Sequence, residues 1–212
     1  MTATDLDGRT AVVTGGSSGI GRGIAREFAA QGAEAVVVAD VREEPKEGGR
    51  PTHELLTDET ETDSVFVDCD VTDLAALREA VAAAEAAGGL DVMVNNAGIW
   101  RSEDFFEVTE AEFQRMLDIN LKGAYFGSQI AAERLVERGG GAIINVSSIA
   151  GLFGNGDWPT YAASKGGLTT LTYSLAHKLG QHGIRVNAIH PGGVQTMIGG
   201  EPSEPDAGAE QA

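Results

Sequence analysis

The chain has 212 residues, of which 32 are acidic and 15 are basic, and its formal net charge of −17 excludes nonspecific binding to nucleic-acid phosphates. Its length suits one domain around a single core. One cysteine, four histidines without ligand spacing and no long apolar stretch argue against a disulfide framework, a metal site and a membrane span, so we expect a cytoplasmic protein.

Short β-branched runs alternate along the chain with longer stretches of helical period. This pattern is typical of a parallel sheet that is covered by helices. The runs predict strands at residues 10–14, 35–39, 64–67, 92–95, 142–146 and 185–189. We therefore expect an α/β fold with a doubly wound sheet of about six strands.

Three of the helices predicted between these strands are marked by an apolar face, a capping box or their bounds. One has its apolar face at Leu74, Leu77, Val81 and Ala84, and another begins at residue 159 and ends near 181. The third spans residues 110–138 and opens with a capping box of Thr109 and Glu112. Its core-facing stripe is expected to consist of Phe113, Met116, Leu117, Leu121 and Ala124.

Two segments lack this regular pattern. Residues 42–63 are rich in carboxylates, proline and glycine, and we interpret them as a loop with a short acidic helix. From residue 199 the composition cannot bury enough apolar surface to order itself. We expect residues 1–198 to form one dinucleotide-binding catalytic domain and residues 199–212 to be a disordered acidic tail or an interrupted substrate loop.

The acidic residues are unevenly distributed. Residues 1–140 carry 27 acids and 12 bases, whereas residues 141–200 carry one acid and three bases. A solvated acidic face is one explanation. Adaptation to high salt, with carboxylates in place of lysines, is the other, and we favour it because only four of the basic residues are lysine.

The first predicted strand runs directly into a glycine-rich loop, Thr14-Gly15-Gly16-Ser17-Ser18-Gly19-Ile20-Gly21, and a helical stretch follows. Backbone N–H groups of such a loop can approach an anion at the helix N-terminus, so a pyrophosphate fits there. The alternative is an ordinary glycine turn.

Asp40 ends the second predicted strand, nineteen residues after Gly21. A carboxylate at this place can accept hydrogen bonds from a ribose diol and repel a 2′-phosphate, which predicts NAD(H) rather than NADP(H). Arg42, two residues further on, could partly restore phosphate binding.

Tyr161 and Lys165 lie four residues apart on a predicted helix and therefore share a face. An ammonium there favours a phenolate. Use of tyrosine as a general base near neutrality needs a pKa depression of about 3 units, or about 4 kcal/mol. The alternative is an exposed lysine that extends from the helix edge into solvent.

Together these motifs resemble the short-chain dehydrogenase/reductase family over residues 8 to about 198, in its single-domain oxidoreductase branch. The resemblance rests on the glycine loop, Asp70-Val71, Asn95-Asn96-Ala97-Gly98, Asn120, Ser148, Tyr161-Ala162-Ala163-Ser164-Lys165 and Pro191-Gly192. It implies a Rossmann-type sheet with strand order 3-2-1-4-5-6. The family's seventh strand is expected to be absent from this chain.

The resemblance also implies a role for each matching residue. Tyr161 would exchange a proton with the substrate, Lys165 would lower its pKa and hold the nicotinamide ribose, Ser148 would hydrogen-bond the substrate oxygen, and Asn120 would complete a proton relay. The resemblance implies Ser148 rather than Ser147, because the family places this serine thirteen positions before the tyrosine. The implied cofactor-binding residues are Gly15, Ser17, Ser18, Gly19, Ile20, Gly21, Asp40, Asp70, Val71, Asn96, Ala97, Gly98, Tyr161, Lys165, Pro191, Gly192, Val194 and Thr196.

The expected function is reversible hydride transfer between NAD(H) and a secondary alcohol or ketone, with Tyr161 as general acid and base. A nucleotide-binding module without catalysis is the alternative, because the last strand is missing. The family resemblance implies a homodimer through the helices at 110–138 and 159–181, and a tetramer is doubtful. Trp100 and Trp158 could line the substrate pocket.

Overall fold

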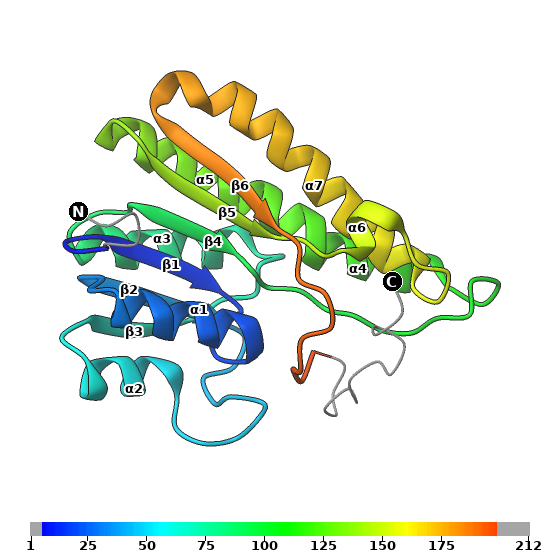
Figure 1. The fold of residues 1–212 in the computed structure, drawn as a ribbon, viewed down its shortest axis with the longest axis horizontal. Coiled ribbons are helices and arrows are strands. Elements are labelled where there is room, and N and C mark those ends of the chain that lie inside the picture. Colours follow the sequence, from blue (N-terminus) through cyan, green and yellow to red (C-terminus); the bar gives the residue numbers. More distant parts are fainter. Residues whose placement is uncertain (1–5, 199–212) are drawn as a thin grey trace.

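The computed structural model describes residues 6–198 and contains one sheet of six parallel strands in the order β3-β2-β1-β4-β5-β6 (Figure 1). The predicted strands and their order are confirmed. Their bounds are β1 (Thr10–Thr14), β2 (Ala35–Asp40), β3 (Asp63–Asp68), β4 (Val92–Asn95), β5 (Gly141–Val146) and β6 (Ile184–Ile189).

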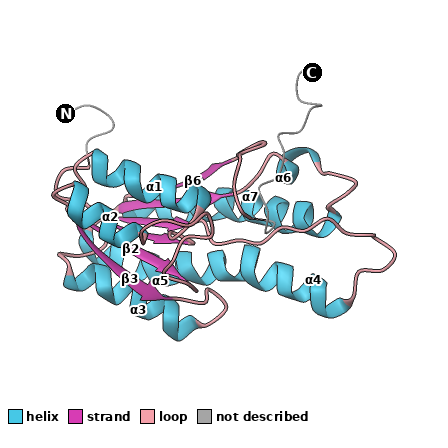
Figure 2. Ribbon diagram, turned by 90° about the horizontal axis from the view of Figure 1, so that it is seen from below, coloured by secondary structure: helices cyan, strands magenta, loops and turns pink. Residues whose placement is uncertain are grey.

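Helices cover both faces of this sheet (Figure 2). One face packs against α1 (Gly19–Ala30) and α2 (Thr52–Glu59), and the other packs against α3 (Leu74–Ala86), α5 (Gly123–Arg138) and α7 (Pro159–Leu179). In β1 the side chain of Val12 belongs to the second face, while Ala11 and Val13 belong to the first. A strand buried on both sides needs apolar residues at every position, which explains the continuous runs in the sequence.

The helical region at 110–138 departs from a regular α-helix. It consists of α4 (Glu110–Leu117), a π-helical turn (Asp118–Lys122) and α5. The capping box of Thr109 and Glu112 is confirmed at the start of α4.

The expectation that Phe113 faces the core is wrong, because its side chain is 42% exposed. Met116 is the only residue of α4 that is buried, so the first turn of this helix, which carries Phe113, lies at the surface. Ala124 of α5 is buried as expected.

The segment from 42 to 63 contains an irregular connection at 42–51 and then α2, whose residues Glu54, Asp58 and Glu59 make it acidic. This agrees with the predicted loop and short acidic helix. A second short helix, α6 (Ala150–Phe153), lies between β5 and α7. The predicted tail at 199–212 lies outside the described residues.

Within residues 6–198 no helix has both the length and the apolar character needed to cross a membrane. In the same range no group of three or more His, Cys, Asp or Glu side chains is placed to hold a metal ion.

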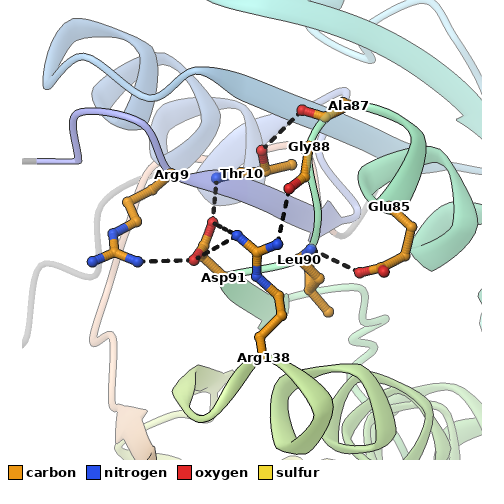
Figure 3. A network of polar contacts seen from close by, with 8 residues as sticks. All are labelled: Arg9, Thr10, Glu85, Ala87, Gly88, Leu90, Asp91 and Arg138. Atoms are coloured by element: carbon orange, nitrogen blue, oxygen red, sulfur yellow. Dashed lines mark hydrogen bonds and ion pairs between the residues drawn. The ribbon is translucent and has the colours of Figure 1, made fainter.

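A polar network centred on Asp91 ties the amino ends of the two central strands together (Figure 3). The Asp91 carboxylate is buried and accepts hydrogen bonds from the Thr10 backbone N–H at 3.0 Å and from Arg9 Nη1 at 2.9 Å. Arg138, the last residue of α5, lies 3.4 Å from the same carboxylate and donates to the Gly88 carbonyl at 2.8 Å. One side chain therefore joins β1, the start of β4 and the end of α5.

We expect Asp91→Ala to lower the free energy of unfolding by about 1–3 kcal/mol, because the buried Thr10 N–H loses its acceptor. Urea denaturation measures this change. Asp68→Ala, which removes an exposed carboxylate at the end of β3, is the control and is expected to stay within about 0.5 kcal/mol of the parent. Equal effects of the two substitutions would contradict the proposed role of the network.

Candidate active site

A cleft of about 310 Å³ opens at the carboxyl ends of the strands. Its wall includes the glycine loop after β1, Asp40 at the end of β2, residues 96–99 after β4, residues 146–148 at the end of β5 and residues after β6. Tyr161 and Lys165 of α7 complete the wall. In open parallel sheets ligands bind at this edge, where the strand order reverses on either side of β1.

The glycine loop depends on close backbone approaches. A side chain at Gly21 would place its Cβ 2.1 Å from the Gly15 carbonyl oxygen and 2.4 Å from Asn96 Nδ2. Gly15 and Gly19 have φ angles of 65° and 53°, in the left-handed region that favours glycine. Only glycines allow this turn to fold against β4 and start α1 directly behind it.

Asn96 fixes the turn from the neighbouring strand. Its Nδ2 donates to the carbonyls of Thr14 at 2.8 Å and Gly15 at 3.1 Å. Thr14 Oγ1 in turn accepts from the backbone N–H groups of Asn96 and Ala97. The glycine loop and the segment after β4 therefore form one rigid unit.

The residues of this unit fit the adenosine and phosphate part of a dinucleotide. Ser17 Oγ is buried and has no hydrogen-bond partner among residues 6–198, so a polar donor or acceptor is left available beside the loop. The Ser17 N–H donates to Asp40 Oδ2 at 3.1 Å, which holds the carboxylate at the loop. Burial raises the pKa of Asp40, and the N–H groups of Ser17, Arg42 and Val41 oppose that rise.

Tyr161, Lys165 and Ser148 meet on the other side of the cleft. The Lys165 Nζ lies 5.8 Å from the centre of the Tyr161 ring and donates to the Val146 carbonyl at 2.7 Å. Both side chains are buried, so the alternative of a solvent-exposed lysine is wrong. Because Lys165 follows Tyr161 by four residues, one turn of α7 presents both groups to the cleft.

Burial moves the pKa values of the two groups in opposite directions. It lowers the pKa of Lys165 to about 8, since the charged ammonium loses solvation. It raises the pKa of Tyr161, and the hydrogen bond with Ser148 opposes that rise. The pKa of the phenol is therefore above its ordinary value, whereas use as a base at neutral pH requires a lower one.

The two serines at the end of β5 have different partners. Ser148 hydrogen-bonds Tyr161 and lines the cleft, and 8% of its surface is exposed. Ser147 Oγ instead donates to the Lys165 carbonyl and contacts Thr169 Oγ1, both at 2.9 Å. The hydroxyl of Ser147 is committed to α7, which agrees with the choice of Ser148 as the candidate catalytic serine.

Asn120 lies in the π-helical turn, one layer behind the cleft wall. Its Oδ1 accepts from the Ile99 N–H at 2.8 Å, and its Nδ2 donates to the Ile99 carbonyl at 2.9 Å and to Ser164 Oγ at 3.1 Å. The amide thereby joins the segment after β4 to α7. Its satisfied hydrogen bonds are compatible with a structural role, a catalytic role or both.

The predicted site residues fall into two groups. Three of them, Ser17, Gly21 and Asn120, are buried behind the cleft wall and support it. The structure brings the others together along the wall itself: Gly15, Ser18, Gly19, Ile20, Asp40, Asp70, Val71, Asn96, Ala97, Gly98, Ser148, Tyr161, Lys165, Pro191, Gly192, Val194 and Thr196.

Some residues at the site did not follow from the sequence. Lys46 and Arg115 line the cleft, although nothing in their local pattern indicates this. Ser164 is completely buried and donates to the Tyr161 carbonyl at 2.7 Å, a position that its place before Lys165 could have suggested. Trp100 and Trp158 pack edge to face, with ring centres 5.3 Å apart, and lie outside the cleft wall.

Comparisons with known proteins match the same chain over nearly its whole length. The family model of the short chain dehydrogenases matches residues 9–206. An uncharacterized oxidoreductase of Thermotoga maritima is 42% identical over 90% of this chain and 73% of its own length. An L-rhamnose 1-dehydrogenase (NAD(P)(+)) of Azotobacter vinelandii is 43% identical over 91% of this chain and 76% of its own length.

Structural comparison gives the same answer. The crystal structure of a putative short-chain alcohol dehydrogenase from Sinorhizobium meliloti matches with a TM-score of 0.85 and 40% identity, over 92% of this chain and 76% of that one. The fold, the cleft at the strand ends and these relatives agree. The chain belongs to the short-chain dehydrogenase family, whose members named here are oxidoreductases.

Proposed function

We propose that the chain is an NAD(H)-dependent oxidoreductase that transfers hydride between the nicotinamide and a secondary alcohol or ketone. The observation that carries this proposal is that Tyr161, Ser148 and Lys165 open on the same cleft as the glycine loop. A proton-transfer group and a nucleotide-binding loop thus share one space.

In this mechanism Tyr161 Oη donates a proton to the substrate oxygen during ketone reduction and removes it during alcohol oxidation. Ser148 Oγ hydrogen-bonds the same oxygen. The Lys165 ammonium stabilises the phenolate form of Tyr161, which the buried site otherwise disfavours. When bound, NAD(H) supplies or accepts the hydride.

Other residues of the cleft would hold the dinucleotide. The N–H group of Ile20 at the start of α1 suits the pyrophosphate. Asp70 and Val71 would flank the adenine, and Asn96, Ala97 and Gly98 would line the adenosine side. Val194 and Thr196 would contact the nicotinamide carboxamide, and Lys165 would also hold the nicotinamide ribose.

Asp40 supports the choice of NAD(H) over NADP(H). Its carboxylate lies in the cleft wall at the end of β2, where ribose hydroxyls are recognised in dinucleotide-binding sheets. A 2′-phosphate at this place would meet a negative charge. The L-rhamnose relative is named for both cofactors, so the selectivity of this chain requires measurement.

The alternative of a nucleotide-binding module without catalysis is not favoured. A pure binding module has no need of a buried lysine beside a buried tyrosine, since each loses solvation there. The relatives are named as oxidoreductases and dehydrogenases.

A homodimer is part of the proposal. Phe113 of α4, Tyr125 of α5 and Tyr173 of α7 are 42%, 46% and 65% exposed, respectively. Exposed aromatic side chains on these helices suit an interface between two copies.

We expect Tyr161→Phe to lower kcat by at least about 100-fold, because the proton-transfer group is lost, and to leave the Kd for NADH unchanged within about 2-fold. Steady-state kinetics with a panel of secondary alcohols and NADH fluorescence titration measure the two effects. Tyr173→Phe, a change of an exposed tyrosine on the same helix, is the control and is expected to retain activity. Unchanged turnover in Tyr161→Phe would overturn the mechanism.

The lowered pKa of Lys165 makes the free energy of unfolding depend on pH. Its pKa is about 8 in the folded chain and near 10.5 when unfolded, so the unfolded state binds more protons between these values and stability rises with pH. From pH 7 to 10 the parent should gain about 2–3 kcal/mol relative to Lys165→Met. Urea denaturation at both pH values measures this.

Lys178→Met, which removes an exposed lysine near the end of α7, is the control for the Lys165 comparison. Its unfolding free energy should follow that of the parent across the same pH range. Parallel curves for Lys165→Met and the parent would show that Lys165 is not held in a desolvated environment.

Light scattering tests the dimer. We expect the parent chain to show twice the mass of one chain, and the double variant Tyr125→Glu with Tyr173→Glu to move toward the mass of one chain, because charges would be buried at the interface. A parent that remains monomeric at working concentration would contradict this part of the proposal.

A further inference from the structure

The connection between β2 and α2, residues 42–51, is largely exposed but is bonded to the glycine loop. The Lys46 backbone N–H donates to Ser18 Oγ at 2.8 Å. At the end of the connection, Thr52 Oγ1 donates to the Ser17 carbonyl at 3.2 Å. Both contacts fall on the turn that precedes α1.

Arg22 of α1 holds the same connection from the helix. Its Nη1 donates to the Arg50 carbonyl at 2.9 Å and to Thr52 Oγ1 at 3.0 Å. Its side chain is only 13% exposed. The connection is therefore fastened to the loop and to α1 at several points.

This arrangement brings the Glu47 carboxylate to the start of α1. Glu47 Oε1 accepts from the Gly19 N–H at 3.1 Å and lies 4.0 Å from Arg22 Nε. Ser18, at the N-cap position, makes no side-chain capping bond, so Glu47 satisfies a donor that the local sequence leaves open.

Glu47 and Asp40 are thus bound to one three-residue turn. Asp40 accepts from the Ser17 N–H and Glu47 from the Gly19 N–H. Ser17 Oγ of the same turn is buried and has no hydrogen-bond partner within residues 6–198. Lys46 is the nearby cation that acts on Asp40, whereas Arg22 is already engaged by the connection and Glu47.

We infer that Glu47 is a second residue that determines cofactor selectivity, acting with Asp40 against a 2′-phosphate. This inference rests on the proposed use of NAD(H). NAD(H) and NADP(H) carry the same pyrophosphate, so a competing carboxylate at Gly19 affects both alike. The 2′-phosphate is an additional negative charge beside Asp40. The negative charge of Glu47 repels it, because charges closer than a Debye length are only weakly screened from each other.

The test isolates the adenosine end of the cofactor. Calorimetric titration gives the Kd values of 5′-AMP and adenosine 2′,5′-bisphosphate. The Kd of the bisphosphate divided by the Kd of 5′-AMP measures the penalty on the 2′-phosphate without any turnover. Glu47→Gln keeps an Oε1 acceptor for the Gly19 N–H and removes only the charge. We expect the ratio to fall about 3- to 10-fold toward equality.

Glu44→Gln is the matched control, because Glu44 is an exposed carboxylate on the same connection. It should leave the ratio within about 2-fold of the parent. In a second arm, Asp40→Asn should leave a residual preference for 5′-AMP that the added Glu47→Gln substitution reduces further.

The outcomes separate this inference from the proposed function. If the parent binds NADH and 5′-AMP but Glu47→Gln leaves the ratio unchanged, or strengthens both ligands equally, the selectivity role of Glu47 is wrong and the NAD(H) proposal stands. If the parent binds neither NADH nor 5′-AMP, the proposed function fails and the inference fails with it.

Discussion

The pairing of β1 with β4 is the constraint on which the site depends. Polar clamps hold the two strands at both ends. At the amino end the buried Asp91 accepts from Thr10, and at the carboxyl end Thr14 Oγ1 bonds the backbone of Asn96 and Ala97. Segments about 80 residues apart in the chain are therefore fixed relative to each other.

The direction of the chain then determines where a ligand can lie. Because β2 and β4 flank β1 on opposite sides, the connections after β1 and β4 leave the sheet toward different faces and open a cleft between them. Gly21 lets the first of these connections turn back onto Asn96, since a Cβ there would collide with both Gly15 and Asn96. The glycine pattern of the sequence is thus a packing requirement as well as the proposed means of binding phosphate.

The opposite wall is assembled by a similar close approach. A Cβ at Gly151 would lie 2.6 Å from the Lys165 carbonyl carbon, so only glycine lets α6 pack onto α7 at that level. This contact brings the end of β5 against the turn that carries Tyr161 and Lys165. Ser147 and Ser148, at this end of β5, have different roles. Ser147 secures the α7 backbone, while Ser148 remains free to hydrogen-bond the phenol.

The strands and the site motifs could be predicted from the sequence because they are local patterns. A buried parallel strand is apolar throughout, and the Tyr161–Lys165 spacing fixes a shared helix face. The π-helical turn at Asp118–Lys122 could not be predicted in this way, because Asn120 within it bonds Ile99 and Ser164, which are distant in the chain. The exposure of Phe113 also depends on tertiary packing, because α4 buries only Met116.

The positions of Ser17, Gly21 and Asn120 behind the cleft wall also require the tertiary structure, since a motif does not reveal which of its members face a ligand. Glu47 is the clearest case. In sequence it is one carboxylate among many in an irregular acidic segment, and only the folded connection brings it to Gly19.

The net charge of −17 and a dinucleotide site appear incompatible, and the structure shows how one chain can contain both. The positive end of α1 and the N–H groups of the glycine loop attract a phosphate over a few ångströms, whereas the dispersed carboxylates are screened beyond about a Debye length. Attraction is thus local to the loop, and the carboxylates at its border act at the same short range. The proposed discrimination against a 2′-phosphate therefore rests on where two carboxylates lie relative to the loop, with Asp40 at the Ser17 N–H and Glu47 at the Gly19 N–H.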